Sequence, residues 1–360
     1  MQLELHGSTI VADAALDGAG GEQIRAATRD RRAALVSDSN VMPLHGEPLA
    51  RRLGVAADDC FTVPAGEGSK SRSEWARLTD MMLARGFGRD TIIIAVGGGV
   101  VGDLAGFVAA TYMRGVPFVQ VPTTLLAMID ASIGGKTGID TPAGKNLVGA
   151  FHHPALVVAD PATLRTLPNR EFRSGLAEAL KHAVITSAEQ LDWLVSESEG
   201  IAALDTGVIA LLLRRNVQIK HAVVTRDERE SGLRKTLNAG HTIGHAIESV
   251  SGFEMLHGEC IAIGLVVEAI IAVGLRIAEQ SLVDQVKNAA MKLNLPVALP
   301  AKLSVDELIA ATKSDKKARA GVVEYALFSA VGHCAGENHG FGTPVADSVV
   351  RAALNMAVSR

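Results

Sequence analysis

Short apolar runs alternate with amphipathic stretches through residues 1–150. The apolar runs predict strands at 33–36, 60–64, 91–96 and 116–121, and each run ends in a loop of glycine or small polar residues before a helical pattern begins. This alternation is typical of an open parallel sheet with helices on its faces. Ligands of such sheets bind at the carboxyl ends of the strands, so we expect a site in these loops.

The pattern changes after Pro168, where apolar positions recur three and four apart. Asn169 is a suitable cap for the first helix of this region, so we place a domain boundary here: an α/β domain over 1–167 and an all-α domain over 168–360. The predicted helices are 169–185, 206–229, 236–250, 257–278, 281–292 and 304–312. Residues 322–328 are the strongest strand candidate in this half, and we expect them to form part of a hairpin or an edge strand.

Composition narrows the functional classes for this chain of 360 residues. Its formal net charge of −4 argues against nucleic acid as a partner, because proteins that bind phosphate backbones carry a basic excess. The three cysteines form no CxxC pair, and no signal peptide is visible, which favours a cytoplasmic protein. The most apolar stretch, 261–273, is too short to span a bilayer and contains Glu268, so we expect a buried helix and no membrane partner.

A glycine-rich turn, Gly97 to Gly102, follows the most apolar predicted strand and opens a helix ending its first turn near Asp103. Glycines let backbone N–H groups approach a pyrophosphate, and a helix N-terminus favours negative charge. The GxGxxG spacing is only loosely met, and a tight strand–helix turn without a ligand is an equally good interpretation. Polar residues on the two preceding strand–helix loops could bind ribose hydroxyls or could be solvated: Asp38, Asn40, Glu67 and Lys70.

Four residues of the helical half are candidate metal ligands. Glu178 lies in an otherwise apolar helix, His241 and His245 form an HxxxH pair on one helix face, and His257 begins the next predicted helix. A glutamate with two histidines leaves coordination positions open, as a catalytic zinc-type site requires. Surface or capping histidines give the same pattern, and HTIGH lacks the glutamate of the HExxH peptidase motif.

Charged and amide side chains, most of them cationic, lie beside glycines and beside these candidate ligands. Singly, each is most simply a solvated surface residue; together they suit a substrate that carries both phosphate and carboxylate. The set comprises Arg114, Asp130, Lys136, Lys145, Asn146, Lys181, Lys220, Arg234, Asn238 and the late run Asp315-Lys316-Lys317.

From about Thr91 to Ala262 the chain resembles the 3-dehydroquinate synthase family of sugar-phosphate cyclases. The segments that carry the resemblance, in order, are GGGVVGDLAGFVAATYMRG, VPTTLLAMIDASIGGKTGID, GKNLVGAF, SGLAEALKH, RDERESGLRKTLNAGHTIGHAIE and LHGECIAIG. GEGSKS before this region and SDKK after it resemble the family more weakly. The resemblance implies a Rossmann-like N-terminal domain, a helical C-terminal domain and an active site between them.

The resemblance also implies cofactors and ligand sets. Zinc or cobalt would be bound by Glu178, His241 and His257. NAD would contact Asp38, Asn40, Glu67, Lys70, Gly98, Gly99, Val100, Val101, Asp103, Thr123 and Thr124. Catalysis would involve Asp130, Lys136, Asn146, Lys181 and His245. Substrate would be bound by Arg114, Lys145, Lys220, Arg234, Asn238 and one of Lys316 and Lys317.

The implied reaction converts 3-deoxy-D-arabino-heptulosonate 7-phosphate to 3-dehydroquinate and phosphate, a step of the shikimate pathway, with no net redox change. Arg114 would reach the substrate phosphate of a neighbouring subunit, which implies a homodimer. Three alternatives remain: a sister cyclase acting on sedoheptulose 7-phosphate or glucose 6-phosphate, a metal-dependent polyol dehydrogenase, and an inactive NAD-binding homologue. Arg234 with Lys220 resembles a carboxylate clamp, which neither of the first two would need.

Overall fold

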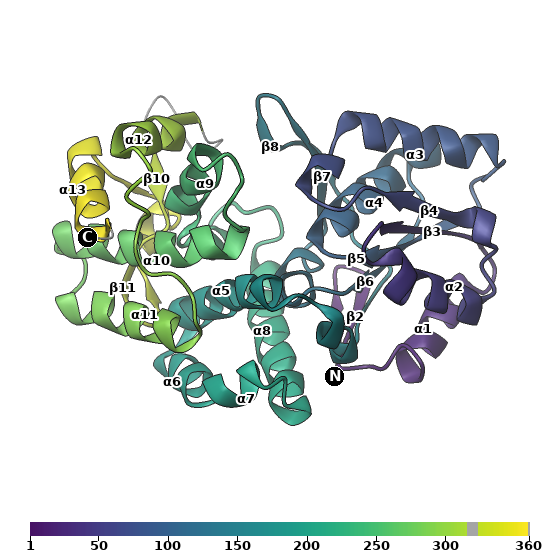
Figure 1. Cartoon of the computed structure of the whole chain (residues 1–360), viewed down its shortest axis with the longest axis horizontal. Coiled ribbons are helices and arrows are strands. Elements are labelled where there is room, and N and C mark those ends of the chain that lie inside the picture. Colours follow the sequence, from purple (N-terminus) through teal and green to yellow (C-terminus); the bar gives the residue numbers. More distant parts are fainter. Residues whose placement is uncertain (315–322, 359–360) are drawn as a thin grey trace. The chain divides into compact units, whose positions relative to one another are not determined.

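The computed structural model describes residues 1–314 and 323–358 and divides into two compact units (Figure 1). The first comprises Met1–Pro168 with Ile209–His221, and the second comprises Asn169–Val208 with Ala222–Arg360. Residues 209–221, which the sequence-based division assigns to the helical domain, therefore pack with the first unit.

Polar contacts explain why residues 209–221 pack with the first unit. The Arg214 guanidinium donates to the Asp13 carboxylate at 2.5 Å, and the His221 ring lies 2.7 Å from the Glu4 carbonyl oxygen. Lys220 forms an ion pair with Asp130. The amphipathic pattern predicts a helix here, but it carries no signal for which unit the helix packs against.

A seven-stranded sheet forms the centre of the first unit, in the order β1-β2-β9-β6-β5-β3-β4. All neighbouring strands are parallel except β1 and β2. The strands are β1 Gln2–Leu5, β2 Ser8–Ala12, β3 Arg32–Asp38, β4 Cys60–Val63, β5 Thr91–Gly97, β6 Phe118–Pro122 and β9 Leu156–Ala159. The chain leaves β3 toward β4 and returns on the other side of β3 as β5, so the strand order reverses between β3 and β5. In open parallel sheets such a switch point is where ligands bind.

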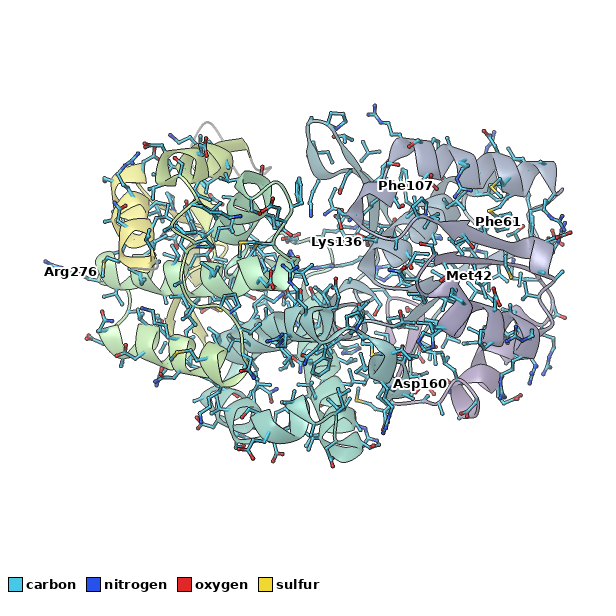
Figure 2. The ribbon with its side chains drawn as sticks, in the orientation of Figure 1. Met42, Phe61, Phe107, Lys136, Asp160 and Arg276 are labelled. Atoms are coloured by element: carbon cyan, nitrogen blue, oxygen red, sulfur yellow. The ribbon has the colours of Figure 1, made fainter. Side chains whose placement is uncertain are left out.

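Helices cover both faces of this sheet: α1 Ala19–Thr28, α2 Glu47–Leu53, α3 Arg72–Ala84 and α4 Gly99–Thr111. Successive residues of a strand point to opposite faces, so β3 sends Ala34 and Val36 to one core cluster and Leu35 to the other. Phe61 and Phe107 belong to the cluster under α3 and α4, and Met42 belongs to the cluster under α2 (Figure 2). Burial on both faces explains why these strands are continuously apolar.

The predicted parallel sheet is confirmed, and a feature that the sequence analysis did not predict lies beside it. Strands β7 Lys136–Thr141 and β8 Gly144–Phe151 form an antiparallel hairpin. The sequence analysis treated this glycine-rich segment only as a candidate anion-binding loop. At Gly138 and Gly149 an added Cβ would lie 2.8 Å and 2.2 Å from backbone oxygens, so these glycines allow the close backbone approach in the hairpin.

The second unit is mainly helical. Its helices are α5 Asn169–Thr186, α6 Ala188–Ser196, α7 Ser198–Ala202, the ends of α8 Thr206–Arg226, α9 His241–Val250, α10 His257–Gly274, α11 Gln280–Lys292, α12 Val305–Ser314 and α13 Asp347–Ala357. The apolar helix α10 packs against α5, α9, α11 and α13, so it forms the core of this unit. Two small two-stranded antiparallel sheets accompany the helices: β10 Glu324–Tyr325 with β13 Thr343–Pro344, and β11 Phe328–Ala330 with β12 His333–Cys334.

The expected helices of this half are confirmed with shifted ends. Helix α9 begins at His241 instead of residue 236, because 233–238 form a 3₁₀ turn and Gly240 has a φ of +78°. Helices α6, α7 and α13 were not predicted. Among the described helices, α10 alone is long and apolar enough to cross a membrane, and 78 % of it is buried inside the protein, as in the core helix of a soluble protein.

Candidate functional site

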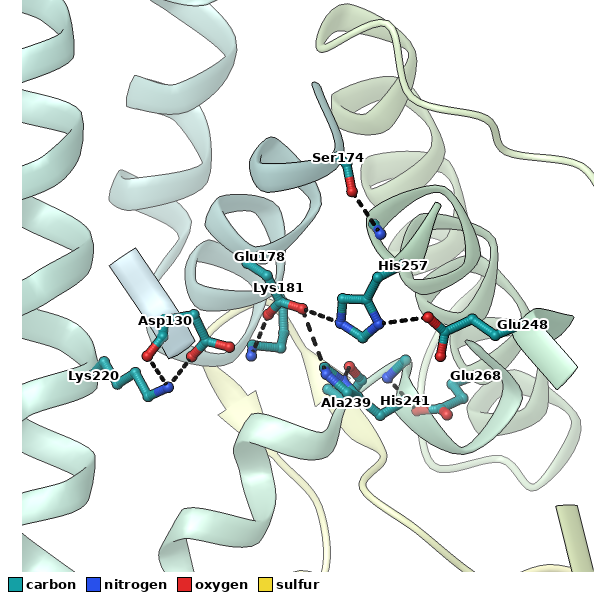
Figure 3. Close-up of polar contacts among 12 residues, drawn as sticks. Asp130, Ser174, Glu178, Lys181, Lys220, Ala239, His241, Glu248, His257 and Glu268 are labelled. Carbon is teal, nitrogen blue, oxygen red and sulfur yellow. Dashed lines mark hydrogen bonds and ion pairs between the residues drawn. The ribbon is translucent and has the colours of Figure 1, made fainter. Parts of the chain in front are cut away.

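Three helices of the second unit bring Glu178, His241 and His257 together. Glu178 lies on α5, His241 is the first residue of α9 and His257 is the first residue of α10. One ligand atom from each lies within 4.8 Å of the other two, and the Glu178 side chain is wholly buried (Figure 3). Two imidazole nitrogens and a carboxylate oxygen form the donor set of a zinc-type ion with open coordination positions.

Glycines allow the three helices to approach closely enough for this convergence. A Cβ added at Gly264 of α10 would lie 2.0 Å from the Gly240 carbonyl oxygen at the start of α9. A Cβ added at Gly258 would lie 1.9 Å from the Ser174 carbonyl oxygen on α5. Both distances are far shorter than any contact between a Cβ and a backbone oxygen, so the packing of these helices requires glycine at both positions.

Both histidines present the same ring nitrogen to the carboxylate. His241 Nε2 lies 3.5 Å and His257 Nε2 lies 3.1 Å from Glu178 Oε1. Their Nδ1 atoms face other oxygens: His241 Nδ1 lies 3.1 Å from the Ala239 carbonyl, and His257 Nδ1 lies 3.1 Å from Glu248 Oε1. This arrangement directs the two Nε2 atoms to one point beside the Glu178 carboxylate, and the donor set therefore fits a divalent cation.

The electrostatics of the two histidines differ. Burial lowers the pKa of His241 well below its usual value, and the nearby Lys181 ammonium lowers it further although Glu178 opposes both. Burial also acts to lower the pKa of His257, but hydrogen bonds to Glu178 and Glu248 outweigh it and raise that pKa to about 10. A cation at Nε2 would therefore have to displace the proton that faces Glu178, while the Nδ1 proton facing Glu248 stays in place, so cation binding at His257 should depend on pH.

Lys181 and His245, both predicted catalytic residues, lie beside the three ligand candidates. Lys181 is 1 % exposed and forms an ion pair with Glu178 one turn earlier on α5. The ring centroid of His245 lies 5.3 Å from that of His241 and 5.9 Å from that of His257. The structure thus brings together every predicted metal residue and the third histidine, His245, in one polar cluster.

Two glutamates of this cluster were not predicted. Glu248 on α9 faces His257, and the fully buried Glu268 on α10 accepts from the Gly240 backbone N–H at 2.6 Å at the start of α9. Glu268 therefore anchors the helix terminus that carries His241. The sequence analysis used Glu268 only as a break in an apolar run; a carboxylate in an apolar helix was the available signal.

The first unit holds the candidate nucleotide residues at the carboxyl ends of neighbouring strands. Gly97 ends β5 and Gly99 begins α4, and both line a pocket with Gly98, Gln120 and Ser132. A Cβ added at Gly98 would lie 3.1 Å from the Thr124 side chain, so the turn offers bare backbone to a ligand.

Two threonines after β6 complete this edge. The Thr124 hydroxyl accepts from the Ala127 backbone N–H at 3.1 Å, and this bond holds the turn at the strand end. The Thr123 hydroxyl is buried and, within residues 1–314 and 323–358, has no hydrogen-bond partner. A buried hydroxyl of this kind calls for a ligand or water partner, which fits a nucleotide at this edge.

The charged candidates of the first unit pair with one another. Lys70 Nζ lies 2.6 Å from Asp103 Oδ2, and Lys145 Nζ lies 3.2 Å from Glu67 Oε1. Burial by itself lowers the pKa of Lys70, but the carboxylates of Asp103 and Glu67 outweigh it, so that this pKa is raised. The loop after β3 is held by Asp38, which accepts from the Asn40 and Val41 backbone N–H groups at 2.8 and 3.0 Å.

The remaining substrate candidates fall in both units. In the first, Lys220 pairs with Asp130, Lys136 and Asn146 are exposed on the hairpin, and Arg114 is exposed with a φ of +70°. In the second, the buried Arg234 donates to the Glu228 carbonyl and Asn238 donates to Glu230, both at 2.5 Å. Lys316 and Lys317 lie outside the described residues, so their roles stay predictions.

Comparison with known proteins places this arrangement in a family. Residues 60–174 match the model described as 3-dehydroquinate synthase N-terminal, and residues 175–318 match the model described as 3-dehydroquinate synthase C-terminal. A 3-dehydroquinate synthase from Symbiobacterium thermophilum is 48 % identical over 300 residues, covering 82 % of this chain and 84 % of the relative.

Solved structures share the fold. The 2-epi-5-epi-valiolone synthase ValA from Streptomyces hygroscopicus, with NAD+ and Zn2+ bound, is 30 % identical with a TM-score of 0.85 over 99 % of this chain and 98 % of its own. A 2-deoxy-scyllo-inosose synthase complexed with carbaglucose-6-phosphate, NAD+ and Co2+ is 24 % identical with a TM-score of 0.90 over 99 % of this chain and 100 % of its own. The family models, which together match most of the chain, and the identity to the relative lead to one conclusion: the chain belongs to the 3-dehydroquinate synthase family.

Proposed function

We propose that this chain converts 3-deoxy-D-arabino-heptulosonate 7-phosphate to 3-dehydroquinate and phosphate, with NAD and one divalent cation as cofactors. The observation that carries the proposal is the approach of Glu178, His241 and His257 within 4.8 Å in a member of this family. Family membership favours the substrate, since the relative from Symbiobacterium thermophilum is a 3-dehydroquinate synthase.

The donor sets fit the two cofactors. NAD supplies a hydride acceptor and donor, and the cation supplies a Lewis acid that acidifies a substrate hydroxyl and polarises a ketone. Glu178 and the Nε2 atoms of His241 and His257 would hold the cation. Backbone N–H groups of Gly98, Gly99, Val100 and Val101 would hold the pyrophosphate, while Thr123 and the loops with Asp38, Asn40, Glu67 and Lys70 would hold the rest of NAD.

Charged side chains of the chain would bind and orient the anionic substrate. Lys136, Lys145, Lys220 and Arg234 carry the positive charge that a phosphate and a carboxylate require. Asn146 and Asn238 add amide donors, Lys181 neutralises the buried Glu178, and His245 stands beside the ligands as a proton carrier. Elimination of phosphate needs a proton removed beside the new ketone, and cations held around the phosphate would let its own oxygens accept that proton.

We propose further that the enzyme is a cytoplasmic homodimer in which Arg114 reaches the substrate phosphate of the other subunit. The exposed position of Arg114 supports this proposal. Met113 and Arg114 both have positive φ angles, 49° and 70°, and Arg114 ends the 3₁₀ turn Tyr112–Arg114 that follows α4. Sedimentation of the chain, with and without Arg114→Ala, separates the assembly from the role of the guanidinium, since only activity should fall in the variant.

A phosphate-release assay tests the activity directly. The chain is incubated with the heptulosonate phosphate in four mixtures: complete, without NAD, with chelator, and with chelator followed by excess zinc or cobalt. We expect phosphate release in the first and fourth mixtures and no accumulation of NADH in any. Steady NADH production would indicate a polyol dehydrogenase, and NAD binding without turnover would indicate an inactive homologue.

Substrate choice is tested in the same assay with sedoheptulose 7-phosphate and glucose 6-phosphate. The solved cyclases with this fold make 2-epi-5-epi-valiolone and 2-deoxy-scyllo-inosose, so this comparison is the sharpest available. We expect release from the heptulosonate phosphate alone, because only that substrate carries a carboxylate for Arg234. Equal release from either of the two sugar phosphates that lack a carboxylate would contradict the proposed substrate.

A further inference from the structure

Glu248 lies in the metal cluster although no metal motif pointed to it. It occupies the last part of α9, and its side chain is 4 % exposed. Its carboxylate faces the neighbouring helix, where Oε1 lies 3.1 Å from His257 Nδ1 (Figure 3). A buried carboxylate needs a charged or hydrogen-bonding partner, and His257 is that partner.

The two ring nitrogens of His257 face two different carboxylates. Nε2 lies 3.1 Å from Glu178 Oε1 and Nδ1 lies 3.1 Å from Glu248 Oε1. A neutral imidazole carries one proton, and an ionised carboxylate can only accept. When a cation takes the Nε2 position, the single remaining proton is on Nδ1, where the Glu248 carboxylate accepts it and fixes the orientation of the ring.

His241 offers a parallel within the same cluster. Its Nδ1 lies 3.1 Å from the Ala239 carbonyl, which is also an acceptor, and its Nε2 faces Glu178. Both imidazoles are thus oriented by an oxygen behind Nδ1, a backbone carbonyl in one case and a carboxylate in the other. A carboxylate behind a ligating histidine also raises the basicity of the nitrogen that binds the metal.

We infer that Glu248 is a positioning residue that orients His257 and strengthens its Nε2 as a ligand, without binding the cation itself. This inference rests on the proposed metal dependence. The competing possibility is a cation held by His245, Glu248 and His257, whose ligand atoms also lie within 4.8 Å of one another. In that case Glu248 would be a ligand and His257 would bind through Nδ1.

The orientation of both imidazoles favours the first arrangement. A cation beside Glu178 uses the Nε2 atoms of His241 and His257 at once and keeps both Nδ1 hydrogen bonds. A cation beside Glu248 would take the place of the Nδ1 proton and would leave Glu178 paired with Lys181 and outside the coordination of the ion. The fully buried Glu178 carboxylate makes the first arrangement the better electrostatic match.

Metal affinity of substituted chains tests this inference. The full-length chain and four variants, Glu248→Gln, Glu248→Met, Glu178→Gln and Glu254→Gln, are titrated with Zn2+ against a competing chelator. We expect affinity to fall about 10- to 100-fold in Glu248→Met and less in Glu248→Gln, whose amide oxygen can still accept the Nδ1 proton. Glu178→Gln should lose more than either, because it removes a ligand. Glu254, exposed and paired with Lys302, serves as the matched control and should leave affinity unchanged.

Co2+ provides a second readout that does not depend on turnover. The visible absorption of the Co2+-loaded chain reports the geometry around the ion. We expect it to shift in Glu248→Met and to stay unchanged in Glu254→Gln. If Glu248→Met does not fold, Glu248→Gln has nearly the same volume and carries the test, with a smaller but measurable shift.

The outcomes separate this inference from the proposed function. A wild-type chain that binds no Zn2+ would overturn the proposed metal dependence and the inference with it. A wild-type chain that binds one Zn2+, together with Glu248 variants of unchanged affinity, would overturn the inference alone. Loss in Glu248→Gln as large as in Glu178→Gln, or two ions bound per chain, would show that Glu248 is a ligand and would also overturn it.

Discussion

The candidate nucleotide site of the first unit is made largely of backbone at the ends of strands, whereas the candidate metal site of the second unit is made of side chains on three helices, one of them, Glu178, fully buried. Gly97 to Gly99 offer backbone peptide groups to a ligand, and few side chains take part in the turn. Glu178, His241 and His257 instead depend on helices that touch through glycines, and on Glu248 and Glu268 behind them.

This difference has a physical consequence. A sheet positions its strand ends through the whole hydrogen-bond ladder, so a backbone site tolerates changes in single side chains. A side-chain cluster on packed helices depends on each contact, because close-packed interiors transmit strain. We therefore expect substitutions to cost more in the second unit than in the first.

Gly264→Ala tests the helix packing behind the metal cluster and should have the largest effect. The added Cβ would lie 2.0 Å from the Gly240 carbonyl and 3.0 Å from the Gly244 nitrogen, so backbone must move. We expect the free energy of unfolding to fall by about 3 kcal/mol, the upper end for an overpacked core, as measured by urea denaturation. Gly274→Ala in the same helix meets only Val349 at 3.7 Å and should cost nothing. Similar stability of the two variants would disprove the packing requirement.

His241→Ala tests the cluster itself, because it removes a ligand and leaves the glycine contacts between the helices unchanged. Changing a residue that only supports a metal ligand costs roughly 10- to 100-fold, so loss of a ligand should lower phosphate release by at least about 100-fold. The measurement is the rate at equal Zn2+ occupancy and at limiting Zn2+. In the first unit, Asn40→Ala should lower the rate far less, since Asp38 accepts from the Asn40 backbone and that bond survives. A near-wild-type rate for His241→Ala without added metal would contradict the site assignment.

Lys70→Met tests a buried ion pair in the nucleotide site, between Lys70 and Asp103. Lys70 is 5 % exposed and Asp103 is 21 % exposed, so removal of the lysine leaves a partly buried carboxylate without its cation. We expect a loss of about 2 kcal/mol in the free energy of unfolding, below the 3–5 kcal/mol of a fully buried pair because solvent screens Asp103.

A double-mutant cycle separates this pair from its surroundings. Lys70→Met with Asp103→Leu should recover part of the loss, and the binding constant for NAD should change less than additively. Strictly additive losses in the double variant would show that Lys70 and Asp103 act independently. The nucleotide site would then depend on its backbone groups even more than we propose.

The sequence revealed the two sites to different extents. The glycine turn was visible as a candidate because it follows an apolar strand, although a turn without a ligand gives the same pattern, and the strand predictions followed from burial on both faces. Glu248 was not visible because its role depends on an angle between α9 and α10 that no local pattern encodes. The hairpin β7–β8 was missed because its glycines resemble those of a loop.

The same limit explains the position of residues 209–221. Their amphipathic pattern predicts a helix, and the helix is present, but its partners Asp13 and Glu4 lie about 200 residues earlier in the chain. Tertiary contacts of such separation leave no trace in periodicity. Resemblance to a family supplied the ligand set that periodicity alone left open among four residues.

Asp227→Asn should have the smallest effect. It tests a place in the second unit where a single carboxylate binds several backbone N–H groups, as an anionic ligand would at a backbone site. Asp227 accepts from the backbone N–H groups of Ser231, Gly232 and Arg234 at 2.7–2.9 Å and from the Ser231 hydroxyl at 3.1 Å. Burial alone raises its pKa, but these hydrogen bonds outweigh burial and lower the pKa to about 2, from 3.8.

Because the folded-state pKa is depressed, the stabilisation is present above the unfolded-state value and is lost as pH falls through the folded-state value. Discounted for solvent screening, it amounts to about 1 kcal/mol. The difference in unfolding free energy between wild type and Asp227→Asn should therefore be constant near neutral pH, shrink below about pH 4 and vanish near pH 2. A difference independent of pH over this range would mean that the loop before Arg234 is held by packing, as in the helices, and not by the carboxylate.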